Sequence, residues 1–356
     1  MQRDERPPTA LRLLIRKARF RPQRSLSDDS ACRSFRGVLW RSRPAYLACA
    51  VCFLWAAASP LAAQLVPPGD EPYFEAYSHS EPITQWPLTK VRHQVPELKG
   101  LEPLRDQSRL PEILRGVSAN LQKFVVNFVD VTAQEIIDEA GPVPNPDGQL
   151  RAPMTKRITE KYRYLILARR EGGAFTLAEY RTDLHGREED AQKAKNHFVE
   201  TTGFALMPLF FGPLQQPWSD FRYLGRQIIG GSATEVVAFA EHPEPVAVMG
   251  HLVIGHASVP MLVQGVAWIR TSDYQILQIR TDLLAPLQRL KRVTTLVQLA
   301  ENHLQDVPAA LWLPQKVDVN VGLGDFHFSN RHRYSDYQLF RVKSVIRTDT
   351  PAPPPH

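Results

Sequence analysis

Hydrophobic positions recur at every second residue over most of the chain beyond residue 160. In KVDVNV (316–321), Val317, Val319 and Val321 fall on one side, and FRVKSVI (340–346) repeats the alternation. A period of two residues predicts half-buried β-strands. The segments that follow it are 161–170, 174–184, 222–229, 234–240, 246–256, 262–270, 274–283, 292–300, 315–321, 326–334 and 337–347.

Two pairs of these segments have the spacing of hairpins. EGG separates 161–170 from 174–184, and TSD separates VQGVAWIR from YQILQIRTDLL. In the second pair, one strand carries Val266, Trp268 and Arg270 on one face. Its partner carries Leu277 and Ile279 on one face and Ile276, Gln278 and Arg280 on the other, so one face is expected to pack and the other is mixed. Such a sheet either packs on a helix with its other face in water, or curls around a ligand.

One segment ahead of the strands has a helical period. Apolar residues recur at i, i+3, i+4 and i+7 over 110–128, with Ser108 as the expected N-cap and Pro111 in the first turn. This stripe, which includes Phe124 and Phe128, is expected to face the core. Residues 188–204 also have a helical composition, and 142–149 forms a loop.

Many strands with few helices favour an antiparallel sheet over βαβ units. No Gly-rich loop lies between a strand and a helix, so neither a Rossmann nor a P-loop site is indicated.

The net charge of +6 belongs to the N-terminal region. Residues 1–63 hold twelve basic and four acidic residues, a net of +8, so the remainder carries −2. The sequence therefore predicts no nucleic-acid partner.

The leader has the parts of an export signal. Arg41 and Arg43 precede an apolar run, and PLAAQ offers a cleavage point after Ala63, so 38–63 is predicted to be a signal peptide. An uncleaved anchor is the alternative, and no later segment is apolar enough to span a membrane once the signal is removed. We expect 1–37 to be a disordered or mis-called N-terminal extension, with an Arg-rich transit peptide as the alternative.

All three cysteines, Cys32, Cys49 and Cys52, lie in this leader. A chain beginning at Gln64 has no thiol for a disulfide, a metal site or a nucleophile.

The domain plan downstream of the leader is simple. Seven prolines punctuate 64–103, which is expected to be an extended Pro-rich arm that lies along the surface of the domain or fills its concave face. Residues 104–347 form a single domain with a curved sheet, and the tail 348–356 is expected to be disordered.

Candidate chemistry is sparse. His251 and His256 are five residues apart, as are His327 and His332, and an odd separation puts residues on opposite faces of a strand. The chain lacks G-x-S-x-G, H-E-x-x-H and S-x-x-K, so no catalytic residue, metal or cofactor is predicted and the motif evidence is against an enzyme.

Two resemblances bear on the function. Residues 95–114, 124–135, 265–286 and 330–346 resemble uncharacterised secreted proteins of acidobacterial type. The order of elements, and AWIRTSDYQILQIR in particular, resembles the lipoprotein-carrier (LolA/LolB-like) superfamily. The second resemblance implies an α+β, mainly β fold: a large curved antiparallel sheet, an open half-barrel, with helices packed near its start and an apolar cavity for acyl chains.

The expected function is that of an exported envelope protein, periplasmic or secreted, that binds a lipid or a lipidated partner in the concavity of its sheet. The alternatives are a structural or protein-interaction module of the envelope and a hydrolase with scattered catalytic residues. The candidate cavity residues are Trp268, Val266, Phe239, Val237, Phe340 and Val342.

Overall fold

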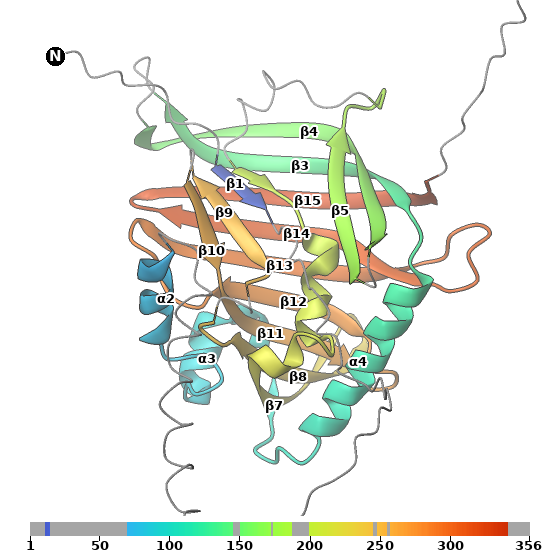
Figure 1. The fold of residues 1–356 in the computed structure, drawn as a ribbon. Helices are drawn as coiled ribbons and strands as arrows, with labels where there is room; N and C mark the ends of the chain where they lie inside the picture. The colour runs from blue at the N-terminus through green and yellow to red at the C-terminus, as the bar shows by residue number, and fades with distance from the viewer. Residues whose placement is uncertain are drawn as a thin grey trace, which may run out of the picture.

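A computed structural model describes residues 11–14, 70–144, 150–171, 174–186, 199–244, 248–254 and 257–340. Its body is one 11-stranded sheet, open at both edges and antiparallel throughout, which confirms the predicted fold class (Figure 1). In sheet order the strands are β2 (Glu102–Pro103), β7 (Ser219–Ile229), β8 (Ser232–Glu241), β11 (Val263–Arg270), β12 (Ile276–Leu283), β13 (Leu290–Asn302), β14 (Leu311–Leu323), β15 (Phe326–Leu339), β3 (Val131–Pro144), β4 (Leu150–Glu171) and β5 (Ala174–Thr182).

The sheet has an inner face, which we define as the face against which the 3-10 helix η2 (Phe204–Phe211) lies. β5 crosses in front of β13, β14 and β15, so η2 sits within the curl of the sheet (Figure 1). Phe239 of β8 packs on η2, with ring centroids 5.6 Å from Phe210 and 5.2 Å from Phe211. A second sheet, in the order β10 (Ala257–Met261), β9 (Gly250–Ile254), β1 (Leu11–Leu14), β6 (Val199–Thr201), lies on the same side.

The predicted helix is α4 (Leu110–Asn127), which buries Ile113, Val117 and Leu121. Its N-cap is Arg109, because Ser108 instead donates its hydroxyl to Asp106. Gly116 lets the β11–β12 turn approach closely, since a Cβ there would lie 2.3 Å from the ring of Tyr274. The helix therefore packs on the end of the hairpin that carries Trp268.

The arm is not extended, which corrects the prediction for 64–103 over its described part. It forms α2 (Glu71–Ser78), α3 (Leu88–Gln94) and η1 (Pro96–Leu98) before β2. Prolines stand in the first turn of α2 and of η1 and at the N-cap of α3. The missing N–H costs nothing at these positions and the fixed φ suits a helix start, so proline here begins helices.

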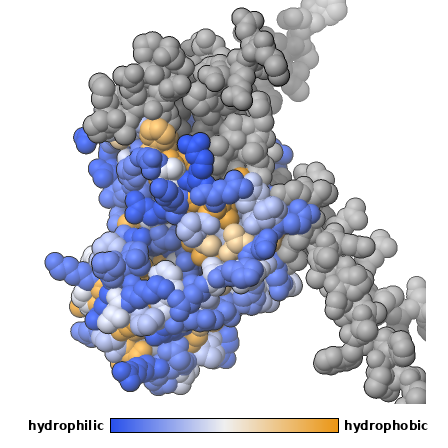
Figure 2. Space-filling model, turned by 90° about the vertical axis from the view of Figure 1, so that its left-hand side faces the viewer, coloured by the Kyte–Doolittle hydropathy of each residue, from blue (hydrophilic) through white to orange (hydrophobic). Residues whose placement is uncertain are grey.

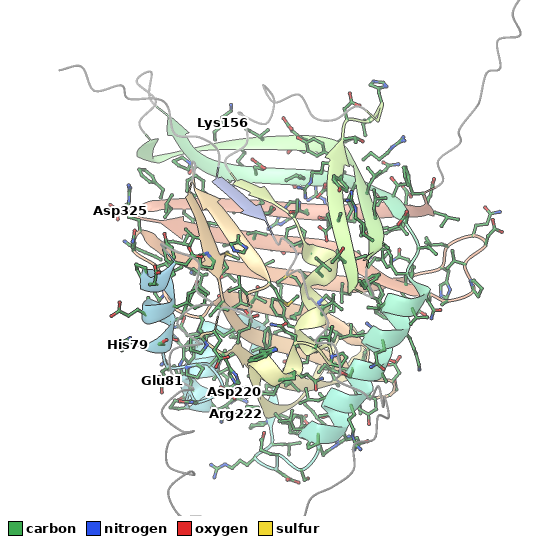
Figure 3. All side chains as sticks on the ribbon, in the orientation of Figure 1. His79, Glu81, Lys156, Asp220, Arg222 and Asp325 are labelled. Atoms are coloured by element: carbon green, nitrogen blue, oxygen red, sulfur yellow. The ribbon has the colours of Figure 1, made fainter. Side chains whose placement is uncertain are left out.

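The arm covers the outer face of the sheet and does not fill its concavity. Arg222 of β7, labelled in Figure 3, donates to the carbonyl oxygens of Thr84 and Trp86. Ile83 N–H donates to the side-chain oxygen of Gln264 of β11. On the same face, Trp268 donates from Nε1 to Gln227, whose amide in turn donates to the carbonyls of Glu97 and Lys99. Seen from the side of α2, the surface is mostly hydrophilic with scattered hydrophobic residues (Figure 2).

Several strand predictions need correction. β3 and β10 have no counterpart among the predicted strands, and residues 199–201 of the expected helix form β6. The predicted strand 337–347 is not separate, because β15 runs on to Leu339 through a bulge at Asp336 (φ 55°). Leu11–Leu14, expected to be disordered, form β1. The signal peptide, the start of the arm, residues 341–347 and the tail lie outside the described residues.

Candidate functional site

A groove of about 280 Å³ lies at the α4 end of the molecule, among the described residues. α4 forms one wall and η2 the other, and the β11–β12 turn and the adjoining ends of β13 and β14 close it. Its apolar lining consists of Val117, Leu121, Phe124, Ala205, Pro208, Leu209, Ile276, Leu299, Ala309, Ala310, Leu311 and Trp312. Polar side chains, among them Asn120, Lys123 and Asn127 of α4, share the lining. We call this site the α4 groove.

The wall that η2 forms is apolar along its length, and hydrogen bonds hold the first residues of η2 in place. Its sequence is FALMPLFF, and Gly203 before it adopts φ 93°, a conformation that favours glycine. The Glu179 carboxylate of β5 accepts N–H groups from Gly203 (2.6 Å), Phe204 (3.2 Å) and Ala205 (2.9 Å). Burial raises the pKa of Glu179, against the effect of these N–H groups. One carboxylate thus anchors the start of the groove wall to the edge strand of the sheet.

The turn that forms the groove's end is held by its own side chains. Arg270 donates to Asp273 through Nε (2.8 Å) and Nη2 (2.5 Å), and its guanidinium lies over Trp312, 4.9 Å from the ring centroid. Hydrogen bonding from Arg270 lowers the pKa of Asp273 despite partial burial. Asn120 of α4 donates to the Asp273 carbonyl at 2.6 Å. The α4 wall is therefore connected to the turn that ends the groove, whose charges are paired.

A second cavity lies beneath η2 and holds about 20 Å³, roughly the space of one water. Its lining is mainly apolar and includes Phe204, Met207, Phe210, Met261 and Leu283. Packing between η2 and the sheet is therefore close but not complete.

The sequence-predicted cavity residues lie elsewhere in the fold. Trp268 and Val266 are fully buried on the outer face beneath the arm, and Val237 and Phe239 are fully buried on the inner face near η2. Phe340 is half-buried at the end of the described chain, and Val342 lies outside it. None of the five described candidates lines either cavity, and their contact with a ligand stays a prediction.

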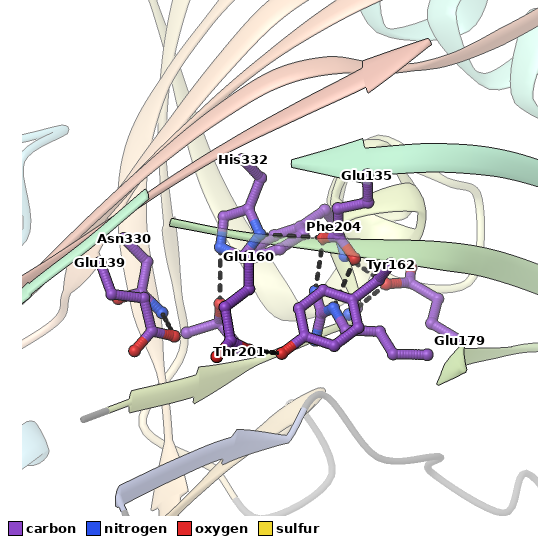
Figure 4. Close-up of polar contacts among 11 residues, drawn as sticks. Glu135, Glu139, Glu160, Tyr162, Glu179, Thr201, Phe204, Asn330 and His332 are labelled. Atoms are coloured by element: carbon purple, nitrogen blue, oxygen red, sulfur yellow. Dashed lines mark hydrogen bonds and ion pairs between the residues drawn. The ribbon is translucent and has the colours of Figure 1, made fainter. Parts of the chain in front are cut away.

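A buried polar network occupies the inner face near the other edge of the sheet (Figure 4). Arg181 of β5 forms a bidentate ion pair with Glu135 of β3. Its Nε lies 2.5 Å from one carboxylate oxygen, and its Nη2 lies 2.8 Å from the other. His332 of β15 bonds Glu135 from Nδ1 and the Thr201 hydroxyl from Nε2, both at 2.9 Å. Burial alone would raise the pKa of Glu135, but Arg181 and His332 hold it at about 2. Burial lowers the pKa of His332, so we expect a neutral ring that donates to Glu135 and accepts from Thr201.

The order hydroxyl, imidazole, carboxylate has the hydrogen-bond pattern of a catalytic triad. Thr201, however, is only 1% exposed, Glu135 is already paired with Arg181, and neither cavity is lined by these residues. Neither of these two cavities reaches the hydroxyl. The network instead links β3, β5, β6 and β15, and so holds the curl of the sheet closed.

The sequence did carry a signal for this network. Four polar residues of this network occupy the same alternate positions as the apolar residues of their strands and therefore lie on the buried face: Glu135, Glu139, Asn330 and His332. Polar residues at core positions need partners, so their phase indicates a buried network even without a motif. The α4 groove left no comparable signal, since its lining comes from five separate segments.

Over the part of the chain that the structure describes, no three His, Cys, Asp or Glu residues come together as a metal site. No helix in that part is long and apolar enough to cross a membrane.

Comparisons with known proteins give structural neighbours alone. No family model and no curated protein matches the chain. Matching solved structures include an outer membrane lipoprotein-sorting protein domain from Vibrio parahaemolyticus (11% identity, TM-score 0.33, covering 63% of this chain and 90% of that one). A DUF1329 family protein from Desulfovibrio piger (9%, 0.33, 65% and 94%) and a LolA superfamily protein from Nitrosomonas europaea (12%, 0.29, 65% and 94%) also match. TM-scores this low decide neither ligand nor function, and the acidobacterial-type resemblance stays a prediction.

Proposed function

We propose that this protein binds a lipid, or the acyl chain of a lipidated partner, in the α4 groove. The supporting observation is a groove of about 280 Å³ with an apolar lining and polar side chains beside it. Ligand sites in proteins are mostly apolar clefts of roughly 300–1,000 Å³ with few polar groups. The groove is slightly smaller than that range, which suits one aliphatic chain with its polar end in water.

The proposed place of action is the bacterial envelope or the exterior, as the leader sequence suggests. A carrier or binding role requires no catalytic group, and the Thr201–His332–Glu135 set is too deeply buried to supply one.

Native mass spectrometry of the purified protein, followed by solvent extraction, tests the proposal. We expect a bound aliphatic lipid that leaves on extraction. A protein that carries no lipid, neither binds an added fatty-acid probe nor exchanges one, and instead co-purifies with a specific protein would favour the envelope-interaction alternative.

Filling the groove provides a sharper test. Ala310 lines the groove and Ala119 is exposed on α4 and is not part of the lining, so Ala310→Trp and Ala119→Trp make a matched pair. Ala310→Trp should weaken binding of a fluorescent fatty acid by at least about tenfold, the equivalent of roughly 1.4 kcal/mol. Ala119→Trp should leave affinity unchanged, and equal affinities in the two variants would contradict the assignment.

Trp268→Ala separates the groove from the site expected at the hairpin. Trp268 is buried against the arm and bonded to Gln227, so its loss should destabilise the fold by roughly 3–5 kcal/mol. Probe affinity per folded molecule should remain that of the unaltered protein. A loss of affinity with little loss of stability would instead support a ligand at Trp268.

A further inference from the structure

The outer face of the sheet is divided into a covered and a bare half. Over β7, β8, β11 and β12 the arm buries Trp268, Val266 and Val236. Over β15, β3 and β4 many outward side chains are exposed, among them Lys161, Arg163, Arg331 and Arg333, while Ile136 is half-buried and Leu165 is buried. The bare half is a sheet surface in contact with water.

Strand register gathers cations on this bare half. Arg333 stands opposite Ile136, which stands opposite Lys161, and residues opposite one another point to the same face. Arg163 of β4 is two residues from Lys161, and Arg331 of β15 two residues from Arg333, so they share that face. The same parity adds Arg157 and Arg169. We call Arg157, Lys161, Arg163, Arg169, Arg331 and Arg333 the basic face.

Among the described residues, two carboxylates beside this face pair with some of its cations. Asp138 pairs with Arg333 at 2.6 Å, and Asp318 is shared between Arg331 at 2.9 Å and Lys316 at 3.0 Å. Arg163 and Arg169 donate to neutral oxygens, the Leu184 carbonyl and the Tyr180 hydroxyl. Their charge is therefore not cancelled by those bonds. Since residues 64–356 carry a net of −2, this face is a local concentration of positive charge on a slightly acidic chain.

Exposed apolar side chains adjoin the cations. Tyr180 is 41% exposed and stands opposite Leu165 on the same face, and Leu184, just beyond β5, is 51% exposed. A basic surface with a neighbouring tyrosine and leucine matches the needs of a membrane interface, where cations meet lipid phosphates and amphipathic rings lie at headgroup depth.

We propose that the basic face docks this protein on an anionic phospholipid surface. Lys and Arg side chains spread over several strands can meet many mobile headgroups without a shaped pocket, and each cation adds to the attraction. The face is on the opposite side of the sheet from the polar network of Glu135, Arg181 and His332, so docking leaves the fold's internal contacts intact. The proposal does not depend on a ligand in the α4 groove.

Vesicle sedimentation tests the proposal on protein purified in the form that its cells produce. We expect binding to vesicles rich in phosphatidylglycerol at about 0.1 M salt and loss of binding near 1 M salt, where the screening length falls from about 10 Å to about 3 Å. Vesicles of phosphatidylcholine alone should bind weakly.

Matched charge variants locate the surface. Arg157→Gln, Lys161→Gln and Arg163→Gln together remove exposed cations from β4, and should lower anionic-vesicle affinity by at least about tenfold. Lys99→Gln, Arg105→Gln and Lys291→Gln remove as many exposed cations from elsewhere and should have little effect. Circular dichroism and melting temperature check that both triple variants fold.

Three results would overturn the proposal. The first is unchanged vesicle affinity in a folded β4 triple variant, and the second is an equal loss in the control variant. The third is failure of the unaltered protein to bind anionic vesicles while it captures an acidic protein or DNA through the same cations. The Ala310→Trp variant should still bind vesicles, so failure of the groove assignment is distinguishable from failure of this one.

Discussion

Glu241 is the side chain whose protonation should affect stability most clearly near neutral pH. It is buried at the end of β8, where burial raises its pKa to about 8 while Val263 N–H and the Gln215 amide donate to it. A raised pKa means that the folded state holds a proton that the unfolded chain releases near pH 4.5. The contribution is therefore fully present below about pH 4.5 and lost as pH rises through about 8.

Glu241→Gln should remove this dependence. The amide keeps an oxygen for Val263 N–H and cannot ionise, so the variant should lose less stability between pH 5 and pH 9 than the unaltered protein. Urea midpoints across that range measure it, with Glu301→Gln, at an exposed site, as control. Parallel curves for the unaltered protein and Glu241→Gln would show that Glu241 ionises normally.

Single residues also show where sequence reasoning reached its limit. The hairpin around Trp268 followed from alternation and turn residues, because both are local. The partners of Glu135 could not follow in the same way, since Arg181 is 46 positions away and His332 is 197. The alternation within a strand shows that a carboxylate points into the core. Which cation pairs with it depends on the order of the strands in the sheet, which the alternation does not give.

Among the elements, η2 has the most distinctive attachment. Glu179 accepts three consecutive backbone N–H groups at its start, and η2 forms a wall of both cavities. Glu179→Ala leaves these donors unpaired, which should cost about 1–3 kcal/mol. Amide hydrogen exchange should accelerate at Gly203, Phe204 and Ala205 while α4 keeps its protection.

Glu301→Ala is the matched control for η2, because it removes an exposed carboxylate from the groove lining without touching those N–H groups. Unaltered exchange at residues 203–205 in Glu179→Ala would mean that packing alone holds η2.

The elements that were predicted differ in kind from those that were missed. β7, β8 and β11–β14 and the helix α4 have regular apolar periods, and the structure has them close to the predicted bounds. β3 was missed because the inward positions 135 and 139 are glutamates, which breaks its hydrophobic pattern. The arm's helices were missed because each proline was taken to interrupt helical structure. In the first turn of a helix proline is favoured, and there it marks where the helix begins.

At the scale of the whole molecule, the two faces of one sheet have different roles in our proposals. The inner face carries η2, the polar network and the α4 groove. The arm covers one half of the outer face, and the basic face lies on the other half. Curvature of the sheet was implied by a resemblance to the lipoprotein carriers. The arm's position on the outer face was left open by the sequence, because its apolar residues would suit either face.

The leader gives the last prediction, since all the strands of the 11-stranded sheet lie beyond residue 101 and the three cysteines lie before residue 53. We expect exported protein to begin near Gln64 and therefore to lose β1, which pairs among the described strands with β6 and β9 of the four-stranded sheet. Its far-UV circular dichroism should remain dominated by strands, and its melting temperature should not change with reductant because no thiol remains. N-terminal sequencing and melting curves with and without reductant measure both. A start at Met1 with a reductant-dependent shift would show that the leader stays and that its cysteines are bonded, and β1 would then be part of the working protein.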